Sequence, residues 1–387
     1  MSSSAPAATA PIDGHCDARF ERVRAEFARN FAERGDVGAA VAVVHRGELV
    51  VDLWGGHTDE TRTVEWQRDS IVNVFSVTKT MTALALLLLI DRGEVDPDAP
   101  VATYWPEFGA HGKQDVLVRH VMSHTAGLPG WPQPIEPAVL YDWDAACAAL
   151  ADQPTWWEPG TASGYHSLSQ GYLSGEIVRR VTGHSLGQFV AREITGPLGA
   201  DFHIGTSAAH DARVVDLIPP GGSRPDPSMF PEEEVVARRA FANIRGFQAA
   251  DSATIAWRRA EIPAANGHGN ARSIALAQAL VSHRGEVFGR RLLSPTAPDV
   301  IFRPQCDNVD KILFQHLRHG IGWGLRCGKL ELPSDTACWW DGWGGSLCVN
   351  DVGHGFTLAY TTDKMMENLG PDARTTPLWQ AVYDIVA

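Results

Sequence analysis

Hydrophobic positions follow the periods of strands and helices at both ends of the chain. Residues 16–34 repeat apolar positions at helical spacing and carry charges on the opposite face. Residues 37–56 (VGAAVAVVHRGELVVDLWGG) indicate two strands around a turn at 45–47, which is a hairpin. Two more apolar strands flank 351–353, and a last helix is expected over 376–387. We therefore expect one antiparallel sheet built from both termini, with helices packed on its faces.

The middle of the chain is mostly helical in period, and Pro- and Gly-rich loops separate its segments. These segments are 82–92, 116–123, 142–151, 168–182 and 185–194. Residues 205–235 form a long loop, either a lid or a plain surface excursion. The fold class expected is α/β. Its expected parts are a flexible tail (1–15), a discontinuous α/β domain (16–90 and 260–387) and a mostly helical subdomain with long loops (91–259).

Composition narrows the function classes. The 387 residues are 44% hydrophobic and 20% charged, as in a soluble globular protein. A net charge of -13 disfavours a nucleic-acid partner and mildly favours a neutral or cationic substrate.

No secretory signal opens the chain, and its longest apolar run, 83–90, is far shorter than the roughly 20 residues that cross a bilayer. We expect a cytoplasmic protein with no membrane span, no cofactor and no metal site, in which six scattered cysteines stay free thiols. The oligomeric state stays open.

One possible nucleophile is Ser185, in the G-x-S-x-G string Gly183-His184-Ser185-Leu186-Gly187. In α/β-hydrolases this string follows a strand and turns sharply into a helix. Here the preceding residues, 171–181, have helical rather than strand period, and a further helix follows. We therefore expect Gly183 to end one helix and Ser185 to cap the next.

Ser76 is a stronger candidate. A short apolar strand at 71–75 leads into it, and an apolar helix follows as far as Arg92. Free N–H groups at a helix N-terminus favour developing negative charge. Lys79 lies one turn along on the same face, and burial would lower its pKa so that it could accept the serine proton, alone or with a phenolate partner. A helix start with an N-cap serine and a solvated lysine would give the same Ser-x-x-Lys spacing.

Two further stretches favour the catalytic interpretation. Tyr165-His166-Ser167 precedes a helix and puts a phenol and a hydroxyl on one loop, although a core tyrosine with a serine N-cap gives this pattern too. Residues 339–346 (WWDGWGGS) contain glycines that let a strand backbone approach a ligand and present N–H groups to it. An edge strand with a bulge is the alternative.

Taken in order, Ser76-Val77-Thr78-Lys79, Tyr165-His166-Ser167 and Trp340-Asp341-Gly342 resemble the three motifs of serine β-lactamases and penicillin-binding proteins. The loop 122–129 (MSHTAGLP) resembles a marker of the class C β-lactamase-like group. Within that group the chain is most similar to the family VIII carboxylesterases. These are esterases on a β-lactamase fold that use Tyr-x-Ser and often carry a G-x-S-x-G string that is not catalytic. The resemblance covers nearly the whole chain and implies a β-lactamase-like sandwich.

The resemblance also implies roles for the matched residues. Ser76 would be the acylated nucleophile, Lys79 its base or proton relay, and Tyr165 the phenol that shares the proton and helps deacylation. Ser167 would hydrogen-bond the Lys79 ammonium or the leaving group. The N–H groups of Ser76 and Trp343 would form the oxyanion hole, unless the third motif is aligned at 343–345, which moves the second donor to Ser346.

The third motif departs from the lactamase pattern, because Trp340 stands where lactamases usually have a lysine that holds the substrate carboxylate. Asp341 would add a negative charge if it faced the pocket. A neutral ester fits better, bound at Gly342 between Trp340, Trp343 and Trp131 as aromatic walls. The expected function is hydrolysis of short-chain acyl esters. Hydrolysis of a lactam, lactone or amide, acyl transfer, and a binding protein without activity are the alternatives.

Overall fold

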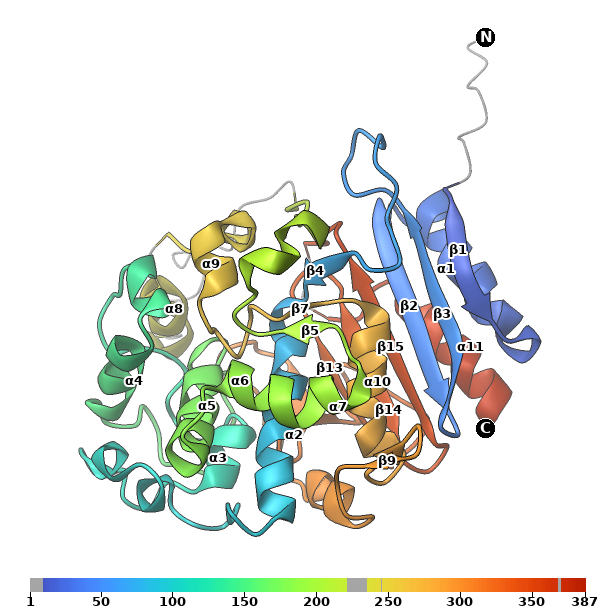
Figure 1. The fold of residues 1–387 in the computed structure, drawn as a ribbon. Coiled ribbons are helices and arrows are strands. Elements are labelled where there is room, and N and C mark those ends of the chain that lie inside the picture. The colour runs from blue at the N-terminus through green and yellow to red at the C-terminus, as the bar shows by residue number, and fades with distance from the viewer. Residues whose placement is uncertain (1–9, 221–234, 245, 368–369) are drawn as a thin grey trace.

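A nine-stranded antiparallel sheet forms the centre of the computed structural model, which describes residues 10–220, 235–244, 246–367 and 370–387 (Figure 1). In spatial order its strands are β1 (Ile12–Cys16), β3 (Glu48–Gly56), β2 (Gly38–His45), β15 (Phe356–Thr362), β14 (Leu347–Asp351), β13 (Ala337–Asp341), β12 (Gly324–Leu325), β11 (His316–His319) and β10 (Cys306–Val309). The first and last parts of the chain meet where β2 pairs with β15, as the two apolar ends predicted.

Helices cover both faces of this sheet (Figure 1). On one face α1 (Glu21–Glu33) and α11 (Thr376–Val386) pack together over the strands and bury a cluster of Phe, Leu and Val side chains. On the other face α10 (Ala271–Ser282) packs on β2, β14 and β15. Because both faces are covered, every residue of β2 is buried, which explains its continuous apolar run.

The expected tail over residues 1–15 is wrong for residues 12–15. They belong to β1, which pairs with β3 and extends the sheet by one edge strand. Residues 1–9 lie outside the described residues. The hairpin between β2 and β3 turns at Arg46 and Gly47, both with positive φ (52° and 80°), the conformation that suits the twist of paired strands.

The middle of the chain is helical, as its period predicted. The helices are α3 (Val118–Met122), α4 (Trp143–Ala151), α5 (Ser169–Thr182), α6 (Leu186–Val190), α7 (Gly196–Leu198), α8 (Val235–Ala242) and α9 (Ile255–Arg259), with a π-helix at Ala191–Thr195. Within the expected long loop at 205–235, residues 205–220 contain a 3-10 helix, Ala208–Arg213, and a short strand, β6 (Val214–Val215). The rest of that loop, 221–234, lies outside the described residues.

A small second sheet carries the segment that leads to Ser76. Its order is β5 (Phe202–His203), β7 (His268–Gly269), β4 (Ile71–Asn73) and β6, and β4 runs parallel to β6. A further two-stranded ribbon joins β8 (Glu286–Val287) and β9 (Arg290–Arg291). Other 3-10 helices are Ala18–Phe20, Phe75–Val77, Val101–Thr103, Pro106–Gly109, Pro137–Tyr141, Ala249–Ala253 and Ala297–Phe302.

Helix α2 (Thr78–Asp91) joins the two parts of the molecule. It packs against α10 on the sheet side and against α5 and α6 on the helical side, so it is buried all round rather than amphipathic. One large hydrophobic cluster therefore runs through both parts. None of the described helices is both long enough and apolar enough to cross a membrane.

Candidate active site

Ser76 lies in the 3-10 turn Phe75–Val77, between strand β4 and helix α2. Phe75, directly before it, has a positive φ of 42°, a left-handed conformation that costs a bulky residue about 1–2 kcal/mol. Such strain is kept only where the surrounding structure enforces it, and it is commonest at functional sites. Here the turn presents the Ser76 side chain to a cavity at the junction of the two parts.

The side-chain nitrogen of Lys79, one helical turn after Ser76, is enclosed by three oxygen atoms. Its Nζ lies 3.0 Å from Ser76 Oγ, 2.8 Å from the carbonyl oxygen of Ser167 and 2.9 Å from that of Ala264. Burial lowers the pKa of Lys79 well below its usual value, and the nearby Asp341 carboxylate opposes this only in part. In its uncharged form the Lys79 amine can donate to the two carbonyls and keep its lone pair for the Ser76 hydroxyl.

Tyr165 approaches Ser76 from the other side. Its hydroxyl lies 2.6 Å from Ser76 Oγ, and its ring centroid lies 4.9 Å from Lys79 Nζ. Burial raises the pKa of Tyr165, so the phenol keeps its proton at neutral pH. The Asp310 carboxylate fixes the loop by accepting the Tyr165 N–H (3.0 Å). The three residues singled out from the sequence therefore meet at one oxygen atom.

The third stretch, residues 340–343, passes close to the segment that leads into Ser76. A Cβ on Gly342 would lie 2.3 Å from the carbonyl oxygen of Val74, so only glycine allows this approach. The Trp343 ring lies 5.1 Å from that of Phe75 and lines the cavity, whereas Ser346 does not line it. Within the described residues the main-chain N–H of Trp343 has no protein acceptor, which leaves it available to a bound oxyanion.

The cavity beside Ser76 holds about 300 Å³ and has a mainly apolar and aromatic wall. Tyr165, Ser167 and Trp340 line it together with Ser76. Further apolar walls come from Phe241, Phe247, Leu313, Phe314, Leu317 and Trp339. Ser167 accepts a hydrogen bond from Lys79 through its main-chain oxygen (2.8 Å), whereas the family resemblance implied its hydroxyl. A hydrogen bond from the Ser167 hydroxyl to a leaving group stays a prediction.

Trp131 is not one of the cavity walls, contrary to expectation. Its side chain is fully buried in the helical region, where the indole N–H donates to the Ala146 carbonyl (3.1 Å) and the ring packs against Tyr172. The sequence signal was only an aromatic residue after the 122–129 loop, and that loop turns the indole into the core.

Comparison with known proteins supports the three-motif interpretation. A family model described as Beta-lactamase matches residues 27–382. The chain belongs to the beta-lactamase family. Esterase/beta-lactamase LipL of Mycobacterium tuberculosis (strain ATCC 25618 / H37Rv) is 36% identical over 384 residues, which cover 95% of this chain and 86% of LipL.

Two solved structures are similar over nearly the whole chain. A family VIII carboxylesterase is 38% identical with a TM-score of 0.91, and the match covers 97% of this chain and 100% of that one. A penicillin-binding protein homolog from Caulobacter crescentus is 36% identical with a TM-score of 0.90 and the same coverage. The expected fold and the family VIII resemblance are confirmed, and this member of the beta-lactamase family is a hydrolase.

A group of histidines around Trp340 was not identified from the sequence, and one of them, His319, lines the cavity. His124 stacks on Trp340 (ring centroids 5.3 Å apart) and contacts Tyr165, while its Nδ1 accepts the main-chain N–H of His166 (3.0 Å). His319 also stacks on Trp340, with ring centroids 5.5 Å apart. Burial lowers the pKa of His166 and His319 to about 4, so both are neutral. His166 accepts the Leu128 N–H (3.0 Å), which holds the loop of Tyr165 in place. Only the MSHTAGLP motif hinted at His124.

Ser185 lies at a helix start, as expected. Gly183 ends α5 in the left-handed conformation, and Ser185 Oγ accepts the N–H of Gln188 as the N-cap of α6. Its hydroxyl donates to Glu261 (2.5 Å). No strand precedes it, so the G-x-S-x-G string here is a pair of helix caps.

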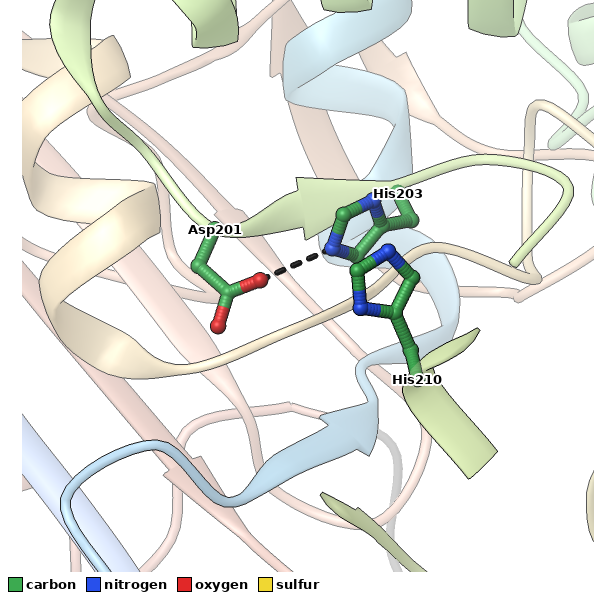
Figure 2. Close-up of side chains that lie close together, drawn as sticks. All are labelled: Asp201, His203 and His210. Carbon is green, nitrogen blue, oxygen red and sulfur yellow. Dashed lines mark hydrogen bonds and ion pairs between the residues drawn. The ribbon is translucent and has the colours of Figure 1, made fainter. Parts of the chain in front are cut away.

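Among the described residues, one cluster of side chains has nitrogen and oxygen atoms spaced like the ligands of a metal site. Asp201, His203 and His210 each offer an atom within 4.8 Å of the others, and Figure 2 shows both imidazoles beside the carboxylate. However, the Arg213 guanidinium donates to Asp201 (2.5 Å and 3.1 Å) and to His210 Nδ1 (2.8 Å). A guanidinium thus takes the place that a metal ion would need, and the cluster joins β5 to the 3-10 helix Ala208–Arg213.

Proposed function

We propose that this protein is a serine carboxylesterase that hydrolyses short-chain acyl esters through an acyl-enzyme on Ser76. One observation carries the proposal: a lysine with a lowered pKa and a tyrosine with a raised pKa both contact Ser76 Oγ. Two titratable groups with opposite shifts around one hydroxyl provide a base and an acid at neutral pH.

In the acylation step the neutral Lys79 amine accepts the Ser76 hydroxyl proton while Oγ attacks the ester carbonyl carbon. The carbonyl oxygen becomes an oxyanion and accepts the N–H groups of Ser76 and Trp343. One such donor is typically worth about 3 kcal/mol of transition-state stabilisation. When the intermediate collapses, the bond to the alcohol oxygen breaks. Tyr165 gives its proton to that oxygen and regains one from the Lys79 ammonium.

Deacylation repeats the same steps with water as the nucleophile. Water loses a proton to the neutral Lys79 amine, directly or through the Tyr165 hydroxyl, and attacks the acyl carbon. The ester bond to Ser76 then breaks, and Ser76 Oγ recovers a proton from the Lys79–Tyr165 pair. Because the two groups exchange one proton, they titrate as a coupled pair.

The cavity supports an ester of modest size as the substrate. About 300 Å³ with aromatic walls fits a short acyl chain and its alcohol. Trp340 supplies no charge to hold a substrate carboxylate, which argues against anionic β-lactams as the main substrate. Lactam hydrolysis is the second candidate, since a relative that covers most of this chain bears the name esterase/beta-lactamase.

The test compares hydrolysis of p-nitrophenyl butyrate by the wild type, Ser76→Ala and Ser185→Ala, with folding checked by circular dichroism. We expect Ser76→Ala to lose at least about 10³-fold in kcat, because Ser76 Oγ is the hydroxyl that contacts both the base and the acid. Ser185→Ala should keep its activity. Nitrocefin measures the lactam reaction, and release of the acyl group to added methanol measures acyl transfer. Loss of activity in folded Ser185→Ala alone would contradict the proposal.

A further inference from the structure

A buried ion pair lies on the wall of the cavity. Lys329, in the connection between β12 and β13, places its Nζ 3.0 Å and 3.1 Å from the two carboxylate oxygens of Asp341, at the end of β13. Only 10% of the Lys329 side chain and 12% of the Asp341 side chain are exposed. Both residues line the cavity, and Lys329 Nζ also lies 5.5 Å from the ring centroid of Trp339.

The pair decides the charge that a substrate meets. Among the described residues that line the cavity, Lys329 is the only Lys or Arg, and Asp341 and Glu367 are the carboxylates. His319 also lines it but is neutral, because burial lowers its pKa to about 4. One positive and two negative groups leave the cavity with a net negative charge. Lys329 and Asp341 are largely buried, so their charges are weakly screened, whereas the exposed Glu367 is screened by solvent.

We propose that Asp341 sets the charge of the acyl ester that this site accepts. Asp341 holds the Lys329 ammonium in an ion pair with both of its carboxylate oxygens. Lys329 is the one lysine or arginine among the described residues that line the cavity, and while it is paired a substrate carboxylate cannot bind it. Neutral and cationic acyl groups are accepted, and acyl groups that carry a carboxylate are rejected. This inference rests on the proposed esterase function and adds the substrate class to it.

The same geometry predicts how the preference reverses. Without the Asp341 charge, the Lys329 ammonium faces the cavity unpaired, and a substrate carboxylate can take the place of the Asp341 oxygens. Without the Lys329 charge, Asp341 and Glu367 both stay unpaired and favour a cationic acyl group. Since Asp341 also raises the pKa of Lys79, its removal changes the rate with every ester, so the informative quantity is a ratio between esters.

The experiment uses 4-nitrophenyl esters of similar length and different charge: the pentanoate, the mono-ester of glutaric acid and the 4-(trimethylammonio)butyrate. The variants are Asp341→Asn, Lys329→Met and the double variant. Asp335→Asn is the matched control, since Asp335 lies in the same connection, pairs with Arg326 (3.3 Å) and does not line the cavity.

We expect Asp341→Asn to raise the anionic-to-neutral ratio of kcat/KM at least about tenfold over the wild type. The double variant should have the wild-type ratio, and the control Asp335→Asn should also have the wild-type ratio. Lys329→Met should raise the cationic-to-neutral ratio by a similar factor.

Unchanged ratios in folded Asp341→Asn and Lys329→Met would overturn the inference and leave the esterase function standing. If Asp341→Asn does not fold, the cationic ester with Lys329→Met decides the same question. A wild type that hydrolyses none of the three esters would instead overturn the proposed function.

Discussion

At the residue scale the chemistry is defined by Lys79 and Tyr165, which contact Ser76 Oγ, and by two carbonyls that contact the Lys79 nitrogen. Burial acts in opposite directions on the two titratable neighbours, lowering the pKa of Lys79 and raising that of Tyr165. Both shifts favour the uncharged form, the amine of Lys79 and the phenol of Tyr165. The two carbonyl oxygens, from Ser167 and Ala264, keep the amine oriented.

This arrangement predicts a pH dependence with a definite sign. Activity requires the neutral Lys79 amine, so kcat/KM should rise as pH passes upward through the Lys79 pKa, at a pH well below that of an ordinary lysine. Because the Asp341 carboxylate raises this pKa, Asp341→Asn should move the acid limb of the profile to lower pH. The measurement is kcat/KM for p-nitrophenyl butyrate against pH, with Asp335→Asn as control. A move to higher pH in Asp341→Asn would contradict the assignment of Lys79 as base.

The sequence predicted residues whose relation is local, and the family resemblance added Tyr165, which meets Ser76 only through the fold. Contacts that have neither a local spacing nor a motif were missed. Ser76 and Lys79 are one helical turn apart, so their proximity follows from helix geometry alone. Lys79 to Ala264, by contrast, spans 185 positions of the chain. Lys329 could not be found either, because nothing in a connecting loop indicates which way its side chain turns.

At the scale of elements, hydrophobic period located the long helices and strands well. It placed the β2–β3 hairpin, α5 and α11 closely, because each buries one face or runs through the core. It missed β11 and β12, which have only four and two residues and too little length for a period. It also predicted that Ser185 caps a helix, since the residues before the G-x-S-x-G string have helical period.

The cluster of Asp201, His203, His210 and Arg213, which joins β5 to the 3-10 helix Ala208–Arg213, gives a prediction at the scale of elements. Arg213 donates to Asp201 and His210, two of the three candidate ligands, so the wild type should show no change in Tm with Zn²⁺. Arg213→Ala removes the guanidinium and should create a three-ligand site, with Tm rising by about 2 °C or more in excess Zn²⁺. Adding His203→Ala to that variant should abolish the rise. A rise in the wild type would show that the ion displaces Arg213.

At the scale of the whole molecule, a buried arginine ties the C-terminal segment to the sheet and to the active-site turn. Arg374, 1% exposed, pairs with Asp36 (2.9 Å) before β2 and with Asp372 (2.8 Å). It also donates to the Gly344 carbonyl (2.7 Å), one residue after Trp343. The contact between Arg374 and Gly344 therefore links the packing of the C-terminal segment to the turn that carries Trp343, the proposed oxyanion donor.

Replacing this arginine should therefore affect both stability and rate. Arg374→Met leaves two buried carboxylates unpaired and should lower the free energy of unfolding by about 3–5 kcal/mol. In the folded fraction kcat should fall more than KM rises, because the Gly344 turn loses its anchor. Arg374→Lys keeps the charge and should recover part of both. Urea unfolding and steady-state kinetics measure the two effects, and a loss below about 1 kcal/mol would contradict this role.

The most direct test of the whole account is covalent labelling of the nucleophile. The intact protein is treated with a p-nitrophenyl alkylphosphonate, which forms a stable adduct with an activated serine, and the modified peptide is identified by mass spectrometry. We predict one adduct, on Ser76, and none in Ser76→Ala or in folded Lys79→Met. An adduct on Ser185, or a folded wild type that takes up no label while a known serine esterase does, would contradict the account.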